Sequence, residues 1–492
     1  MSAVDLGRRE FLKVAGLCVA ALPVSAAASA ARRNKDRPNI LFCIADDWSW
    51  PYASIAGARV IKTPTFDRAA REGVLFENAF VSAPSCTPSR GAILTGQWHW
   101  RLEEGCNLWS TLPAKFAVYP DMLEKAGYHV GFTRKGWGPG FDEPGGRTRN
   151  AAGRRFKDFD EFLRARPGDK PFCFWFGSFD PHRPYERLSG VKSGMKAEDV
   201  EVPACLPDCE EVRTDICDYY WEVQRFDREV GELLKALEEK GELDNTLVVI
   251  TGDNGLPFPR CKSNLYDGGT HVPLAVRWPA KVKGGRVVED FISLSDVAPT
   301  FLEAVGPKPI ADMTGRSFLD ILISGESGRV DPARDKVFTG MERHTDRRTG
   351  GVGYPMRAIR THDYLYIRNF KPDRWPAGDP EGYGDIDGSP TKTYMMEHRT
   401  EPGVERLFER AFGKRPGEEL YDLHKDPDQL DNVADKPEYA EAKEKLSTEL
   451  TAELKATKDP RILGKGDMFD KFPYYGSGNK PKAAPKPGGT TR

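Results

Sequence analysis

The sequence lacks an excess of basic residues, which narrows the choice of partners. Its 492 residues contain 72 Lys and Arg against 74 Asp and Glu, so the formal net charge is −2. A nucleic-acid-binding chain is expected to carry a basic excess, and nucleic acid is therefore not an expected partner. An anionic substrate would have to be met by a local basic pocket.

Histidine and long apolar runs are also scarce. Only eight histidines are present, and they form no obvious cluster that could supply the extra metal ligands of a two-metal phosphatase. No apolar run after the N-terminal region is long enough to cross a bilayer, so we expect no transmembrane anchor in the mature chain.

The N-terminal 30 residues have the pattern of an export signal. Arg8 and Arg9 precede an apolar run from residue 14 to 24, and Ala28-Ser29-Ala30 is a small-residue cleavage site. This pattern predicts a twin-arginine signal over residues 1–30, with a Sec-type signal as the alternative. Either signal predicts a periplasmic or extracellular protein.

Apolar segments that alternate with helical patterns predict the fold class. The length suits two packed units. Strands that alternate with helices indicate an α/β domain, with an open, mostly parallel sheet, over residues 31–336. A change of pattern predicts a smaller α+β unit over residues 337–472, and the Gly-, Pro- and Lys-rich residues 473–492 are expected to be disordered. The apolar strand segments of the first unit are residues 38–45, 128–133, 171–179 and 246–251, and its clearest helices are residues 64–73 and 214–240.

Polar clusters follow these strands. Asp46-Asp47, Asp253-Asn254, His182 and Lys135 each come directly after a predicted strand. Ligands of open α/β sheets bind beyond the carboxyl ends of the strands. We therefore expect these side chains to gather at one edge of the sheet.

Four of these side chains are hard oxygen donors. Asp46, Asp47, Asp253 and Asn254 suit calcium or magnesium, whereas zinc prefers His and Cys. Neighbouring carboxylates repel each other, so an apolar strand that ends in Asp-Asp is costly unless a cation neutralises it. The alternative is a solvated turn with helix-capping aspartates.

Cys86 begins a short predicted helix. Pro88 suits a first helical turn, and Gly96 ends the apolar run that follows. Residue 86 therefore lies at a helix N-terminus, where free N–H groups favour an anion. The alternative is an inert buried thiol.

The Cys86 segment resembles the signature of the type I sulfatases. Cys86, Pro88 and Arg90 match its Cys-x-Pro-x-Arg core, and Leu94-Thr95-Gly96 also fits. The resemblance implies an alkaline-phosphatase-like fold, and it implies that a maturation enzyme converts Cys86 to formylglycine (3-oxoalanine). It also implies one calcium ion per chain, held by residue 86 together with Asp46, Asp47, Asp253 and Asn254.

The same resemblance assigns the remaining catalytic groups. Arg90 and the metal would acidify the formylglycine hydrate, and Lys135 and Lys262 match two family lysines that hold sulfate oxygens. His182 matches a family histidine, and we expect it to protonate the leaving group. Surface positions are the alternative for His182 and both lysines.

One position departs from the family pattern. The usual Gly-Lys-x-His reads Arg134-Lys135-Gly136-Trp137 here, so Trp137 replaces a histidine. His129 and His271 are candidate substitutes, although a structural role is the other interpretation for each.

Several segments are similar to heparan N-sulfatases (sulfamidases), which remove the N-sulfo group from glucosamine at a non-reducing chain end. The resemblance spans roughly residues 38–455 and includes Asp253 to Pro259 and Ser263 to Tyr266. It predicts a sulfated carbohydrate as substrate. The alternatives are an O-sulfatase on another sulfated polysaccharide or aryl sulfate, a phosphatase or phosphonate hydrolase of the same fold, and an inactive glycan-binding protein.

Loops of the C-terminal unit supply candidate substrate contacts. Arg343, His344 and Arg357 are suited to a sugar carboxylate or sulfate, with surface ion pairing as the alternative. Cysteines elsewhere suggest structural roles. Cys43 and Cys173 lie in strand segments and are expected in the core, and a disulfide is possible among Cys205, Cys209 and Cys217.

Overall fold

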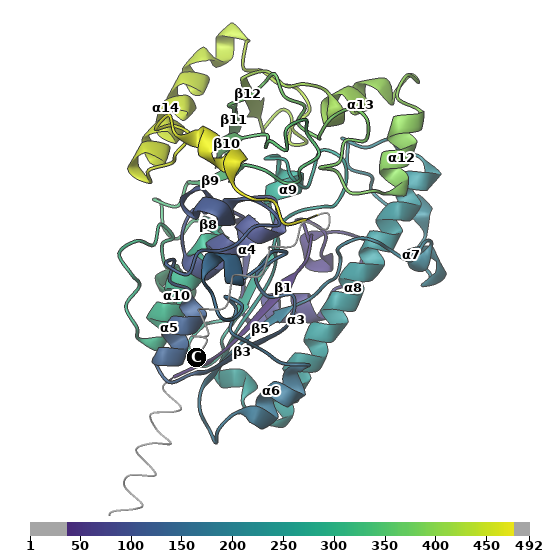
Figure 1. Cartoon of the computed structure of the whole chain (residues 1–492). Coiled ribbons are helices and arrows are strands. Elements are labelled where there is room, and N and C mark those ends of the chain that lie inside the picture. The colour runs from purple at the N-terminus through teal and green to yellow at the C-terminus, as the bar shows by residue number, and fades with distance from the viewer. Residues whose placement is uncertain (1–36, 477–492) are drawn as a thin grey trace, which may run out of the picture.

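The computed structural model describes residues 37–476 (Figure 1). The predicted signal at residues 1–30 and residues 477–492 lie outside the described residues. An eight-stranded sheet forms the larger unit, in the order β4-β3-β5-β1-β6-β7-β2-β8. Only β7 runs antiparallel to its neighbours, which confirms the predicted mostly parallel sheet. The strands are β1 Asn39–Ala45, β2 Val74–Phe80, β3 His129–Arg134, β4 Arg154–Arg155, β5 Phe172–Gly177, β6 Thr246–Gly252, β7 Leu274–Arg277 and β8 Arg286–Ser293.

Helices cover both faces of this sheet (Figure 1). Side chains of β1 alternate between the two resulting cores: Leu41 and Cys43 pack on one side, and Ile40 and Phe42 on the other. Every β1 residue is buried, and the strand is apolar from Ile40 to Ala45. The first face carries α3 (Pro64–Glu72) and α8 (Glu210–Glu239), and the second carries α4 (Cys86–Thr95), α5 (Tyr119–Lys125) and α10 (Val297–Val305).

A smaller antiparallel sheet forms the C-terminal unit at the top of Figure 1. Its order is β12-β11-β10-β9, and α14 packs on it through Leu446, Leu450 and Leu454. The elements are β9 Lys336–Met341, β10 Met356–Thr361, β11 Tyr364–Asn369, β12 Glu418–Asp422, α12 Pro390–Glu397, α13 Glu405–Phe412 and α14 Ala440–Ala456. Shorter helices elsewhere are α6 Phe159–Ala165, α7 Ser189–Lys192, α9 Asp267–Thr270 and α11 Leu319–Ser324.

The strand ends meet as predicted. β1 pairs in parallel with β5 and β6, and β5 pairs in parallel with β3. The loops that follow these four strands therefore leave the sheet at the same edge, and the C-terminal unit closes over that edge.

The predicted tail is partly described. The Tyr475 N–H donates to the Trp109 carbonyl at 2.8 Å, so residues 473–476 lie against the larger unit. Within residues 37–476, no helix is long and apolar enough to cross a membrane.

Candidate active site

Cys86 opens helix α4, as predicted. Ser85 is extended, with φ −159°, and Gly96 ends the helix in the left-handed region with φ 65°. The thiol is buried, with 2% of the residue exposed. The free N–H groups of the first turn favour negative charge beside residue 86.

An acidic cluster lies beside Cys86. Parallel pairing aligns Ala45 with Gly252, so the residues that follow β1 and β6 become neighbours. The Cys86 Sγ lies 3.3 Å from Asp46 Oδ1, and the Asp47 N–H donates to Asp253 Oδ1 at 3.0 Å. One ligand atom from each of Asp46, Asp47, Cys86 and Asp253 lies within 4.8 Å of the others.

Asn254 completes this group. Its Nδ2 donates to Asp47 Oδ1 at 2.6 Å, which leaves Oδ1 of Asn254 buried and without a hydrogen-bond partner. An orphaned buried oxygen among carboxylates is a costly arrangement in an isolated protein. The donor set is rich in hard oxygens, and the residues present therefore fit a hard divalent cation such as calcium.

Three cations surround the acidic cluster. Arg90 is fully buried, and its Nε donates to Asp253 Oδ2 at 2.7 Å. Lys135 Nζ donates to Asp46 Oδ2 at 2.5 Å, and Lys262 Nζ donates to Asp47 Oδ2 at 2.7 Å. The predicted basic pocket is thus local, and it lies within a chain of nearly zero net charge.

These contacts set the protonation states. Burial would raise the pKa of Asp46, but the charges of Lys135, His182 and Arg90 outweigh it and hold that pKa far below its usual range. Burial, followed by the charges of Asp253 and Asp46, raises the pKa of the Cys86 thiol well above its ordinary value. The thiol is therefore protonated at neutral pH and is a poor nucleophile.

His182 lies in the loop after β5 and faces the same cluster. Its Nδ1 lies 2.5 Å from the Arg183 carbonyl, so this nitrogen carries a hydrogen and donates it. The other nitrogen, Nε2, lies 3.9 Å from Asp47 Oδ2. The ring therefore presents Nε2 to the cleft.

Asp387 was not predicted from the sequence. It comes from the C-terminal unit, and it accepts a hydrogen bond from Lys262 Nζ at 3.0 Å. Asp47, His182 and Asp387 bring one ligand atom each within 4.8 Å of the others. Asp387 lies in the aromatic, irregular segment at residues 369–392, and no periodic pattern distinguishes it there.

The structure separates the three predicted substrate contacts. His344 lines the cleft, and its Nδ1 lies 2.9 Å from Ser85 Oγ. Arg343 turns away and donates to the carbonyls of Phe472 and Pro473.

The prediction for Arg357 was wrong. This β10 residue is completely buried, and it pairs with Glu342 at 2.7 Å and with Asp459 at 2.8 Å. Two carboxylates from other segments hold the guanidinium inside the C-terminal unit, so it cannot reach a substrate.

Neither candidate histidine replaces the one missing after Lys135. His129 stacks on Phe162, and His271 stacks on Phe80, and each ring bonds a backbone carbonyl. Neither lines the cleft, and both have structural roles. Trp137 does line it.

The cysteine predictions have mixed outcomes. Cys43 and Cys173 are buried in the core, as expected. All cysteines within residues 37–476 are free, so Cys205, Cys209 and Cys217 form no disulfide there.

A cleft of about 840 Å³ opens over this cluster. Its floor contains Asp46, Cys86, Lys135 and Lys262, and its walls include His182, His344 and Asp387.

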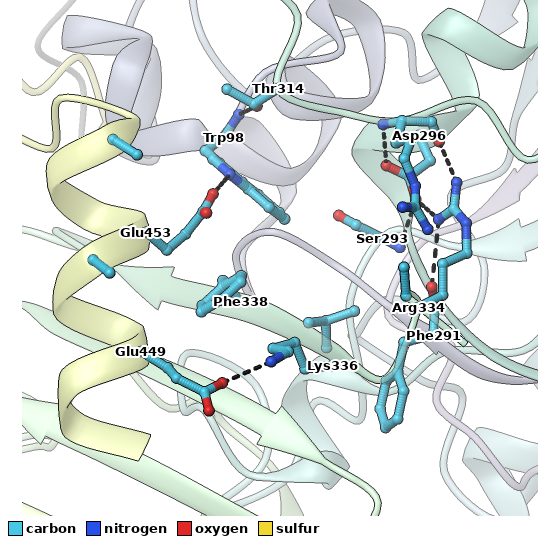
Figure 2. Close-up of a pocket in the computed structure, with 15 residues that line it drawn as sticks. Trp98, Phe291, Ser293, Asp296, Thr314, Arg334, Lys336, Phe338, Glu449 and Glu453 are labelled. Carbon is cyan, nitrogen blue, oxygen red and sulfur yellow. Dashed lines mark hydrogen bonds and ion pairs between the residues drawn. The ribbon is translucent and has the colours of Figure 1, made fainter. Parts of the chain in front are cut away.

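A second cavity, of about 590 Å³, lies between α14 and the β8–β9 region (Figure 2). Its charged groups pair with one another: Lys336 with Glu449, and Arg334 with Asp296. The Trp98 indole N–H donates to Glu453. Of these two cavities, the first is the one that contains Cys86, together with Asp46, Lys135 and Lys262.

Comparisons with known proteins agree with this geometry. Residues 38–307 match the Sulfatase family, and residues 261–381 match the family described as N-sulphoglucosamine sulphohydrolase, C-terminal. Human N-sulphoglucosamine sulphohydrolase is 29% identical over 484 residues, which cover 88% of this chain and 93% of that protein. An ulvan-active sulfatase of Formosa agariphila is 28% identical, over 91% of this chain and 79% of the relative.

A solved structure shares the fold. It is a complex with D-glucosamine-2-N,6-O-disulfate, described as its substrate, and it has a TM-score of 0.63 at 20% identity. The match covers 86% of this chain and 98% of the other, and it supports the predicted alkaline-phosphatase-like architecture. Because the Sulfatase match covers more than half of its residues and surrounds the Cys86 cluster, this chain belongs to the sulfatase family and is a sulfuric ester hydrolase.

Proposed function

We propose that this sulfatase removes a sulfo group from the terminal sugar of a sulfated glycan, with N-sulfoglucosamine as the favoured sugar. The observation that carries the proposal is the convergence of Asp46, Asp47 and Asp253 on residue 86. Three cations border that point, the buried Arg90 and Lys262 and the mostly buried Lys135, and they suit the negative charge of a sulfo group.

Calcium is the proposed metal. Asp46, Asp47, Asp253 and the orphaned Asn254 Oδ1 would hold it together with residue 86. A bound cation would withdraw charge from a sulfuryl oxygen and stabilise negative charge on the nucleophile.

Formylglycine is the proposed form of residue 86. A thiol sulfur is a soft ligand, and it is out of place among the hard oxygens of Asp46 and Asp253. An oxygen at this position would complete the donor set. The hydrated aldehyde would also supply the nucleophile that the protonated Cys86 thiol cannot.

The remaining residues bind and orient the sulfo group. Lys135 and Lys262 are compact point charges at the cleft floor, suited to sulfate oxygens. Arg90 donates to Asp253 and to the Lys135 and Gly136 carbonyls, and it thereby fixes the wall beside residue 86. These fixed donors need no reorganisation during the reaction.

His182 is the proposed general acid. The Arg183 carbonyl holds Nδ1, so a protonated ring presents its second hydrogen, on Nε2, to the cleft. An amide anion or an alkoxide is a poor leaving group at neutral pH, and a proton delivered to its nitrogen or oxygen lets it leave as an amine or an alcohol.

The choice of glycan rests on relatives. The match to N-sulphoglucosamine sulphohydrolase over residues 261–381 includes Lys262 and the cleft wall around His344. The relative that acts on ulvan favours a second candidate, an O-sulfatase on another polysaccharide.

We further propose export by the twin-arginine route, so replacing Arg8 and Arg9 with Lys should retain the protein in the cytoplasm.

Sulfate release tests the proposal. The protein is produced with a formylglycine-generating enzyme, and conversion of Cys86 is measured by mass spectrometry of its peptide. Release from N-sulfoglucosamine is then compared with release from 6-O-sulfated glucosamine. A converted protein that releases sulfate from neither sugar, nor from an aryl sulfate, would refute the proposed function.

A further inference from the structure

The cleft continues away from residue 86, across the carboxyl ends of the strands and toward the outermost strand, β4. Its lining includes Phe179 after β5, Arg134 at the end of β3 and Arg155 at the end of β4. These strands follow β1 outward in the order β1, β5, β3, β4. At about 4.8 Å per strand, β4 lies about 14 Å from β1, farther than one sugar ring extends.

Most cations along this extension are already neutralised. Lys135 pairs with Asp46, Arg134 pairs with Glu229, and Arg225 pairs with Asp180. These guanidinium and ammonium groups have little charge left for a ligand at the outer end.

Arg155 is different. Its side chain is exposed, and within residues 37–476 it forms no ion pair; the guanidinium carbon lies 4.8 Å from the centre of the Phe132 ring. Asp142 also lines the cleft; burial raises its pKa to about 6, the charge of Arg155 opposes that rise, and no salt bridge joins the two side chains. Arg155 thus places an unneutralised cation at the outer end of the cleft.

Phe179 lies between this cation and the reaction centre in strand order. It is 57% exposed, although it belongs to a residue type that is mostly buried. The half-buried Trp109 also lines the cleft. An aromatic face in water suits the apolar C–H face of a sugar ring.

We propose that the outer cleft is a second subsite, in which Phe179 packs against the next sugar unit and Arg155 pairs with an anionic group on that unit. This inference rests on the proposed function, because it assumes a sulfated glycan in the inner cleft. The ligand chemistry is an oxyanion, either a carboxylate or a sulfate, presented about 14 Å from the first strand. The enzyme then favours an anionic oligosaccharide over the terminal monosaccharide alone.

Variants of two adjacent arginines provide a matched test. Arg155→Gln removes the cleft cation. Arg154→Gln removes an exposed neighbour, whose guanidinium lies 4.9 Å from the Phe156 ring and which does not line the cleft. Four substrates share the same sulfated terminal sugar. One is the monosaccharide itself. The other three are disaccharides, whose second unit carries a carboxylate, the uncharged alcohol obtained by reducing that carboxylate, or a sulfate ester of that alcohol.

Arg155→Gln should lower kcat/KM about five- to tenfold for an anionic disaccharide, the effect of a charge-assisted pair in a partly wet site. Arg155→Gln should not change the turnover of the monosaccharide or of the disaccharide whose second unit is uncharged. Arg154→Gln should have the kcat/KM of the wild type on all four substrates. A fall in kcat/KM on the carboxylate disaccharide or on the sulfated disaccharide identifies the anionic group that Arg155 binds. Equal losses on all substrates, or no loss in either anionic arm, would overturn the inference.

Binding measured without turnover keeps the two proposals distinguishable. Calorimetric titration of the disaccharides into Cys86→Ala, with and without Arg155→Gln, reports the subsite even if no sulfate is released. Phe179→Ala should weaken binding of all three disaccharides, and Phe179→Tyr should restore it. Unchanged affinity in Phe179→Ala would remove the aromatic half of the subsite.

Discussion

Calcium should stabilise this protein, and the effect can be measured without any substrate. The buried carboxylates of Asp46, Asp47 and Asp253 and the orphaned Asn254 Oδ1 come together only in the folded chain. The unfolded chain therefore binds calcium much more weakly. At a calcium concentration of 100 times Kd, the gain in the free energy of unfolding is about 2.7 kcal/mol.

The expected shift in melting temperature follows from the size of the protein. About 440 residues at about 2.1 cal/mol/K each give an unfolding entropy of about 0.9 kcal/mol/K. A gain of about 2.7 kcal/mol then raises Tm by about 3 °C. Differential scanning calorimetry of the full chain in calcium and in chelator measures this shift.

Two variants decide the interpretation. Asp253→Asn should lose most of the shift, because it removes a carboxylate from the cluster. Asp160→Asn should keep the whole shift, because Asp160 is exposed on α6. The same Tm with and without calcium, or a full shift in Asp253→Asn, would refute the metal site.

Three further outcomes are expected. A maturation enzyme should convert Cys86 in a peptide or in the unfolded chain but not in the folded thiol protein, where the residue is 2% exposed; mass spectrometry that finds equal conversion would contradict this. His182→Ala should lower kcat by a hundredfold or more for substrates that release an amine or an alcohol and much less for an activated aryl sulfate, and equal losses would exclude the acid role. Arg357→Met should cost about 3–5 kcal/mol in denaturant unfolding, because it leaves Asp459 buried without its cation, whereas Glu342 keeps its ion pair with Arg461; KM should not change in the folded fraction. A raised KM with normal stability would restore Arg357 as a substrate contact.

The inner site was largely predictable from local signals. The largely apolar segments that became β1 and β6 indicate strands buried on both faces, and parallel strands bring their carboxyl ends to the same side of the sheet. Asp46-Asp47 and Asp253-Asn254 were therefore expected on the same side, and the direct pairing of β1 with β6 makes them neighbours. The position of Cys86 at a helix N-terminus was predictable from Pro88 and Gly96, which mark the start and the end of that helix.

The C-terminal contribution was not predictable in the same way. Asp387 lies in an irregular segment, and only tertiary packing brings it to Lys262. Arg357 is an arginine in a strand, and its burial depends on carboxylates at Glu342 and Asp459 from other segments. Composition and periodicity carry no information about such distant partners.

The double contact of Lys262, with Asp47 on one side and Asp387 on the other, limits how such an enzyme can diversify. The distal part of the chain can be exchanged to accept a new glycan while the reacting groups stay unchanged, since those groups are encoded upstream. Any replacement must still provide a counter-charge for this lysine. A replacement segment without such a carboxylate would leave the Lys262 ammonium group less firmly positioned. The enzyme would then accept a new glycan but would bind its sulfate group more weakly.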